Sequence, residues 1–184
     1  MNKLLLFILG ISAAFAALII QTLLVILFPS LVDLASLEKI GYLMMIAVLT
    51  EEILKFALIW KIFNNFKEQI SIFTSALVLG FGFATTEIIL NLFNNPLLTS
   101  ELFFSYLGLL LIHLLTAAFY GCYFSQKGKV ILWQSAPIFG IGLLIHALFN
   151  LGVFYGMSII LLNSILIIVL ILLIKTSFLP KQEK

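Results

Sequence analysis

Long apolar runs limit what this chain can fold into more than any other feature of its sequence. A helix that crosses a bilayer needs ~20 mostly apolar residues, and about six runs reach that length. They cover approximately residues 4–28, 41–63, 72–93, 102–124, 130–154 and 158–178, with only a weak break around Gly156 between the last two. These runs are apolar on every side, whereas barrel strands alternate apolar and polar residues. The sequence therefore predicts an all-α, polytopic transmembrane helix bundle, with residues 1–184 forming one domain.

The composition excludes several other classes of protein. Hydrophobic residues make up 63% of the chain and charged residues 10%, against ~45–50% and ~25% in ordinary soluble domains. So few charges cannot cover so much apolar surface in water. The net charge of +2 is too small for a nucleic-acid partner. The single cysteine, Cys122, excludes a disulfide framework and a cysteine zinc site.

The positions of the lysines predict the orientation of the bundle. Cytoplasmic loops carry an excess of basic residues. If the N-terminus is cytoplasmic, only Lys39 among the loop lysines falls outside. Those that fall inside are Lys3, Lys61, Lys67, Lys127, Lys129, Lys175, Lys181 and Lys184. We therefore expect an N-in, C-in membrane protein. The first run exceeds the 7–15-residue core of a signal peptide, so we expect it to remain as a span.

Polar residues interrupt four of these runs at depths where exposing them to lipid costs free energy. A charge at the centre of a spanning helix costs ~2.5–3.5 kcal/mol, so such groups should face the bundle interior. Glu52 and Lys55 lie three residues apart and can pair on one helix face. At ~1.5 Å per residue, Glu51 and His113 both lie about 15 Å from the outer start of their helices. The residues concerned are Glu51, Glu52, Lys55, Glu87, Asn91, His113, Thr116, His146 and Asn150.

These side chains can therefore meet in one cavity that opens outward, and more than one function is open to such a cavity. Two adjacent carboxylates resist joint ionisation, which is typical of general acid–base chemistry. A proton- or ion-coupled transporter would also bury Glu, His and Lys. Lys55 on its own is expected to be a structural counter-ion. Asn91 and Thr116 are expected to form interhelical hydrogen bonds.

Four motifs in these runs resemble those of a known family. A Glu-Glu-x-x-Lys motif occupies 51–55, and a Gly-x-Gly-Phe-Ala-x-x-Glu motif occupies 80–87. A His-x-x-Thr motif lies at 113–116, and a His-x-x-x-Asn motif lies at 146–150. Together they resemble the motifs of the PrsW family of intramembrane proteases, which is related to the CAAX prenyl protease and bacteriocin-processing group. The resemblance covers about residues 41–155.

The resemblance implies hydrolysis of a peptide bond within or at the edge of the bilayer. In that interpretation, Glu51 or Glu52 is the general base that activates water, and His113 holds or polarises that water. His146 and Asn150 stabilise the oxyanion. Glu87 is a second carboxylate, which fixes a histidine tautomer or shares the water. Lys55, Asn91 and Thr116 have supporting roles.

The resemblance leaves the metal and the substrate open. We expect a metal-free glutamic peptidase rather than a zinc enzyme, because the chain lacks His-Glu-x-x-His and the related CAAX proteases are described as metal-free. If Zn²⁺ is present, the expected ligands are Glu52, His113 and His146. The implied partners are the lipid bilayer and a membrane-embedded or membrane-anchored protein substrate, by analogy an anti-sigma factor. The alternatives are the transporter and a catalytically inactive immunity or scaffold relative.

Overall fold

The computed structural model describes residues 2–29, 37–66, 72–94, 99–126 and 131–177, and every regular element in these ranges is helical. A short 3₁₀ helix, η2 (Leu132–Ser135), leads into the fifth α-helix. The α-helices are α1 (Lys3–Leu27), α2 (Leu37–Phe66), α3 (Ile72–Asn94), α4 (Ser100–Gln126), α5 (Ala136–Phe154) and α6 (Ile159–Ser177). The all-α bundle expected from the apolar runs is confirmed.

Within the described residues, four segments are long and apolar enough to cross a membrane: α1, α3, α4 and the continuous η2–α5 segment. The remaining two helices differ from these in an informative way. Helix α2 has 30 residues but carries Glu51, Glu52 and Lys55 near its centre. The apolar part of α6, Ile159–Lys175, is shorter than the spanning segments. The protein is therefore an integral, multi-pass membrane protein with six α-helices in the described residues, of which four, rather than the expected six, have the length and composition of a span.

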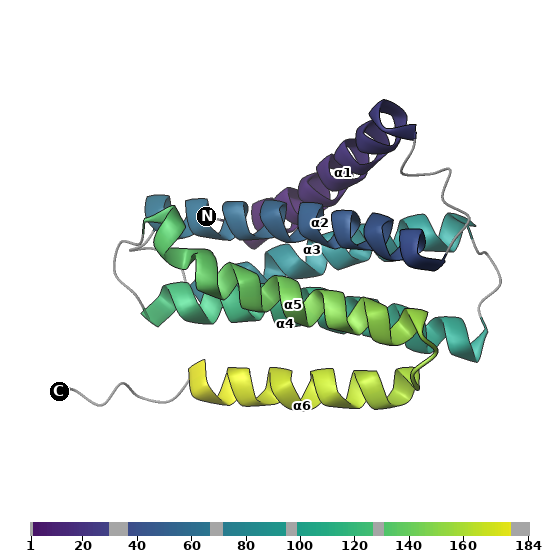
Figure 1. The fold of residues 1–184 in the computed structure, drawn as a ribbon. Helices are drawn as coiled ribbons and strands as arrows, with labels where there is room; N and C mark the ends of the chain where they lie inside the picture. The colour runs from purple at the N-terminus through teal and green to yellow at the C-terminus, as the bar shows by residue number, and fades with distance from the viewer. Residues whose placement is uncertain (1, 30–36, 67–71, 95–98, 127–130, 178–184) are drawn as a thin grey trace.

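Consecutive helices from α2 to α6 run antiparallel, so the bundle has two distinct ends (Figure 1). We call the end where α1 begins and α2 and α6 end the inner end, and the opposite one the outer end. Lys3, Lys61 and Lys175 lie on helix segments close to the inner end. These three lysines thus lie toward one end of the bundle, as their pattern predicts, and the side of the membrane that this end faces stays a prediction. The other lysines used for that prediction have side chains that the structure does not describe. They are Lys39, Lys67, Lys127, Lys129, Lys181 and Lys184.

Helix α4 lies at the centre and contacts α2, α3, α5 and α6. Helix α1 packs mainly on α3 and diverges from α2 toward its C-terminal end (Figure 1). Gly80 allows α3 and α4 to approach closely, because a Cβ there would lie 2.7 Å from the Cβ of Ala117 and 2.9 Å from the carbonyl oxygen of His113. Small residues at helix crossings are typical of membrane bundles. This crossing places Glu87 of α3 beside the middle of α4.

The two halves of the bundle differ in how tightly they are packed. The inner half contains an apolar core formed by α1, α2, α3 and α4, with Leu6, Phe56, Phe63, Leu79 and Phe124 buried in it. The outer half contains cavities lined by both polar and apolar side chains. The polar residues singled out from the sequence lie at the boundary between these halves, so the tight core closes them off from the inner end.

Candidate active site

Lys55 is completely buried in the middle of α2, and its ammonium group has three partners. It donates to Oε1 of Glu52 on the preceding turn, to Nδ1 of His113 over 2.9 Å and to Oγ1 of Thr116 over 3.0 Å. An ammonium has three hydrogens, so each one has an acceptor. The ion pair expected from the three-residue spacing of Glu52 and Lys55 is present, and α4 supplies the other two partners.

Glu52 is also fully buried, and protein groups occupy both of its oxygens. Besides Lys55, Oε1 lies 2.7 Å from Nδ1 of His146, and Oε2 accepts a hydrogen bond of 2.7 Å from the hydroxyl of Tyr120. Helix α5 reaches this tyrosine only because residue 142 is glycine: a Cβ there would lie 2.2 Å from the Tyr120 oxygen. Glu52 thus joins α2, α4 and α5. Unlike Glu51, it does not line the cavity that lies beside this cluster.

These contacts assign the hydrogen-bonding state of the two imidazoles. An ammonium can only donate, so Nδ1 of His113 accepts and its Nε2 carries the proton, which points to Oε2 of Glu87 over 2.5 Å. A carboxylate can only accept, so Nδ1 of His146 donates to Glu52. The free Nε2 of His146 then lies 3.8 Å from Oε2 of Glu51. The rings themselves meet edge to face, with centroids 5.1 Å apart.

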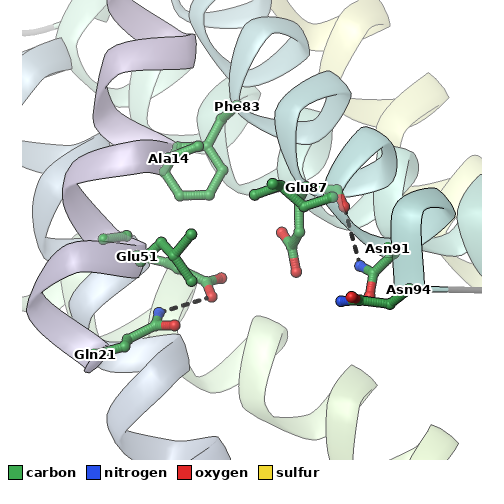
Figure 2. A pocket seen from close by; sticks show the side chains of 10 residues that line it. Ala14, Gln21, Glu51, Phe83, Glu87, Asn91 and Asn94 are labelled. Carbon is green, nitrogen blue, oxygen red and sulfur yellow. Dashed lines mark hydrogen bonds between the residues drawn. The ribbon is translucent and has the colours of Figure 1, made fainter. Parts of the chain in front are cut away.

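Glu51 and Glu87 line a cavity of about 200 Å³ between α1, α2 and α3. Figure 2 shows the two carboxylates extending into it from facing sides. Gln21 of α1 also lines the cavity and donates a hydrogen bond of 3.2 Å to Oε1 of Glu51. The lining continues past Asn91 to Asn94, the last residue of α3. The cavity therefore runs from Glu51 and Glu87, which contact the two histidines, toward the outer end, as the depth of the polar residues predicts.

Three of the described residues are suited to hold a metal ion. One ligand atom each from Glu51, His113 and His146 lies within 4.8 Å of the others. Two imidazoles and a carboxylate form a known catalytic zinc set. The Nδ1 of His146 is held by a carboxylate, which is the usual support for a metal-binding imidazole. The donor chemistry therefore fits a divalent metal, with Glu51 in this group rather than Glu52.

The structure places Asn150 outside the cluster formed by the carboxylates, the histidines and Lys55. It lies one turn beyond His146 on α5 and lines a second, neighbouring cavity. Asn91 lines both cavities, and its amide donates to the carbonyl oxygen of Glu87 over 3.0 Å. The cluster itself brings together Glu51, Glu52, Lys55, Glu87, His113, Thr116 and His146.

Sequence reasoning missed two residues that contact this cluster. Tyr120 looks like any other aromatic residue of an apolar run, and nothing nearby in the sequence marks it as the partner of Glu52. Gln21 offered a weak signal, because an amide in the middle of the first apolar run needs a hydrogen-bonding partner. The sequence does not determine how the helices that carry these residues are rotated about their axes, and so does not show which neighbours the two side chains face.

The fold and this site define a class: a multi-pass membrane protein with a buried carboxylate–imidazole centre beside a cavity of about 200 Å³. A sequence model described as PrsW family intramembrane metalloprotease matches residues 2–175. The chain therefore belongs to the PrsW family, and the resemblance found in its four motifs is confirmed. The match also extends to α1 and most of α6. Among curated proteins and among solved structures, none matches the chain.

Family membership makes this protein an intramembrane peptidase embedded in a lipid bilayer, and a bacterial membrane is typical of the family. The expected general activity is thus confirmed. The family description names a metalloprotease, so the expectation of a metal-free glutamic enzyme is not confirmed and the description points the other way. The Glu51, His113 and His146 group makes Zn²⁺ compatible with the site.

Proposed function

We propose that this protein hydrolyses a peptide bond of a membrane-associated protein at the inner end of the cavity lined by Glu51 and Glu87. One observation carries the proposal: four helices direct two carboxylates and two imidazole Nε2 atoms toward one place. Lys55 and Glu52 hold those imidazoles from behind. Placing such a cluster of ionisable groups inside a membrane costs free energy, and peptide hydrolysis would account for the presence of each group.

In the proposed mechanism, Glu51, His113 and His146 are the residues that would hold a divalent metal. A metal bound there supplies a Lewis acid, which polarises the scissile carbonyl and makes water a better nucleophile at neutral pH. Glu87 is the second carboxylate of the cavity, and we assign it the role of general base. It takes a proton from the attacking water and returns it to the leaving amine. Glu52 and Lys55 keep the histidine rings in place.

A metal-free glutamate mechanism is the second candidate, and the hydrogen bond between His113 and Glu87 favours it. That bond uses the Nε2 proton of His113, which a metal ligand would have to release. In this version Glu51 activates the water, and His146, protonated on both ring nitrogens, donates from Nε2 to the developing oxyanion. Both versions need the carboxylate of Glu51, whereas only the first needs a metal.

The direction in which the cavity opens supports a substrate class. The cavity reaches Asn94 at the outer end, which the lysine pattern assigns to the extracytoplasmic side. A substrate would then present its cleaved bond from a membrane-anchored protein with an extracytoplasmic segment. An anti-sigma factor fits this description by analogy only.

The proposal can be tested by comparing newly formed protein termini in membranes from cells that carry the native form, Glu51→Gln or Glu101→Gln. Glu101 is an exposed carboxylate in the first turn of α4, remote from the cluster along that helix, and is the matched control. Termini made by the native form and by Glu101→Gln, but absent with Glu51→Gln, would support the proposal. Identical termini in all three would overturn it, and Glu51-dependent proton flux into vesicles would then support the transporter. A chain inactive in both assays would be the immunity or scaffold relative.

A further inference from the structure

A second cavity of about 380 Å³ lies beside the first, between α2, α4 and α5. The two share Asn91 as a lining residue. Most of its wall is apolar, including Leu109 and Phe149, but Ser105, Tyr106 and Asn150 add polar atoms. The mechanism proposed above uses none of these residues, so the purpose of this cavity needs a separate explanation.

The register of the helices connects this cavity to the catalytic cluster. On α2, α3, α4 and α5, a lining residue and a cluster residue stand four or seven positions apart, so they share one helix face. At ~1.5 Å per residue, these separations are roughly 6 and 10 Å along the bundle. The cavity therefore continues the site by one to two turns toward the outer end. The pairs are Met44 and Glu51, Asn91 and Glu87, Tyr106 and His113, and Asn150 and His146.

Among the residues described, one buried polar atom of the cavity lacks a partner. The hydroxyl oxygen of Tyr106 is buried and has no hydrogen bond within the described part of the chain. A buried hydroxyl without a partner is destabilising, because the hydrogen bonds that it would make to water are not replaced. Because Tyr106 and Asn150 line the same otherwise apolar space, a ligand with both apolar surface and hydrogen-bonding groups would complete it.

A peptide segment about to be cleaved has this combination of properties. Within a helix, the scissile carbonyl is already hydrogen-bonded and is shielded by neighbouring turns. An unwound segment exposes its N–H and C=O groups, which must find partners inside a membrane. The Tyr106 hydroxyl and the Asn150 amide can each provide one, while Leu109 and Phe149 contact an apolar side chain.

We propose that the second cavity binds an unwound, apolar segment of the substrate and accepts an apolar side chain close to the cleaved bond. An extended chain advances ~3.3 Å per residue. The one-to-two-turn offset of the cavity therefore places this side chain two or three residues from the bond. This inference depends on the proposed function, because it assigns a substrate-binding role next to the proposed catalytic residues.

The first test measures cleavage preference. Purified protein in phosphatidylcholine vesicles is given a pooled library of synthetic single-span peptides, in which the residues flanking a central Gly-Asn pair are varied among Gly, Ala, Leu and Phe. Cleavage sites are read by mass spectrometry. We expect the native form to prefer Leu or Phe over Gly by roughly 10-fold or more at one position, two or three residues from the cleaved bond.

Two variants connect that preference to the cavity. Leu109→Trp fills the space and should shift the preference to Gly or Ala, while Leu144→Trp, on a residue 58% exposed on α5, should not. Tyr106→Phe keeps the shape and should raise KM several-fold with little change in kcat. An unchanged preference in Leu109→Trp together with an unchanged KM in Tyr106→Phe would overturn the inference.

A second readout does not require catalysis. Ser105→Cys, combined with Glu51→Gln, should form a disulfide with library peptides that carry a cysteine beside the Gly-Asn pair, whereas Leu144→Cys with Glu51→Gln should not. Cross-linking at residue 105 without any cleavage by the native form would keep the binding inference and contradict the proposed peptidase. Cleavage by the native form, without cross-linking at residue 105 and without a change of preference in Leu109→Trp, would support the proposed peptidase and contradict the binding inference.

Discussion

The Nζ of Lys55 lies 2.9 Å from Nδ1 of His113, and this contact determines which nitrogen of the imidazole faces Glu87. The ammonium donates to Nδ1, so Nε2 is directed with its proton at Glu87. A buried cation on α2 thereby orients a side chain on α4 toward a carboxylate on α3. The lysine of the Glu-Glu-x-x-Lys motif is thus a counter-ion for Glu52 and also a positioning residue for His113.

Replacing Lys55 by methionine should destabilise the protein by about 3–5 kcal/mol, because removing one partner leaves a buried charge on Glu52 uncompensated. Unfolding in detergent micelles measures this change. The double variant Lys55→Met, Glu52→Gln should recover part of the loss. Lys61→Met, at an exposed position on the same helix, is the control. A loss as small as that of the control would contradict the role assigned to Lys55.

The neighbouring glutamates should respond differently to the same substitution. Glu51→Gln should lower peptide hydrolysis by roughly 100-fold or more and leave stability nearly unchanged, because Glu51 lines the cavity. Glu52→Gln should lower the free energy of unfolding, because Lys55, His146 and Tyr120 all contact its carboxylate. Activity assays and unfolding curves of both variants check this contrast, and the opposite pattern would exchange their roles.

Metal analysis of the purified protein should find about one divalent ion per chain, since two imidazoles and a carboxylate make one catalytic site. Glu51→Ala and His146→Ala should lose the ion, and Glu101→Ala should retain it. A chelator should abolish hydrolysis, and added Zn²⁺ should restore it. Full activity in protein shown to be free of metal would instead support the glutamate mechanism.

Two glycines on α5 provide a matched pair. Gly142→Ala would place a Cβ 2.2 Å from the Tyr120 oxygen, whereas a Cβ at Gly140 meets nothing within 4 Å. We expect Gly142→Ala to cost about 1–3 kcal/mol, as in overpacked interiors, and to reduce hydrolysis by displacing Tyr120 from Glu52. Gly140→Ala should be neutral or stabilising by up to about 1 kcal/mol. Thermal unfolding and peptide-hydrolysis assays of both variants test this. Equal effects of Gly142→Ala and Gly140→Ala would exclude the contact with Tyr120 as the cause of any loss.

The hydrogen bond from Gln21 predicts a contribution of α1 to catalysis. A hydrogen bond to a charged group is worth ~1.5–3 kcal/mol, so Gln21→Leu should lower kcat/KM by about 10- to 100-fold if that bond holds Glu51 in its reactive position. Thr22→Val, at the next and exposed position, is the control. Peptide-hydrolysis kinetics with both variants test this, and an unaffected Gln21→Leu would limit α1 to packing.

The positions of the helices could be predicted closely because each depends on a local run of apolar residues. Even the weak break around Gly156 separates α5 from α6, and this glycine adopts a positive φ of 73°. Helix α2 extends well beyond the predicted 41–63, to Leu37 and Phe66. Its extra turns include the polar residues Glu38, Lys39, Asn64 and Asn65, which an apolar window leaves out.

The site was predictable in its membership but only partly in its arrangement. Charged and polar residues in apolar runs stand out, so Glu51, Glu52, His113 and His146 could be identified. Adjacent residues on a helix point about 100° apart, and the sequence does not determine how α2 is rotated against its neighbours. Which glutamate lines the cavity therefore became visible only once α1 and α3 were in place around α2.

The contacts of Lys55 also affect how the chain is made. Its partners His113 and Thr116 lie 58 and 61 residues further along the sequence, so α2 leaves the ribosome well before they exist. Its central charges would each cost ~2.5–3.5 kcal/mol in lipid until then. We therefore expect α2 to enter the lipid fully only after α4 is synthesised, so that stable insertion of this early helix depends on a helix made later.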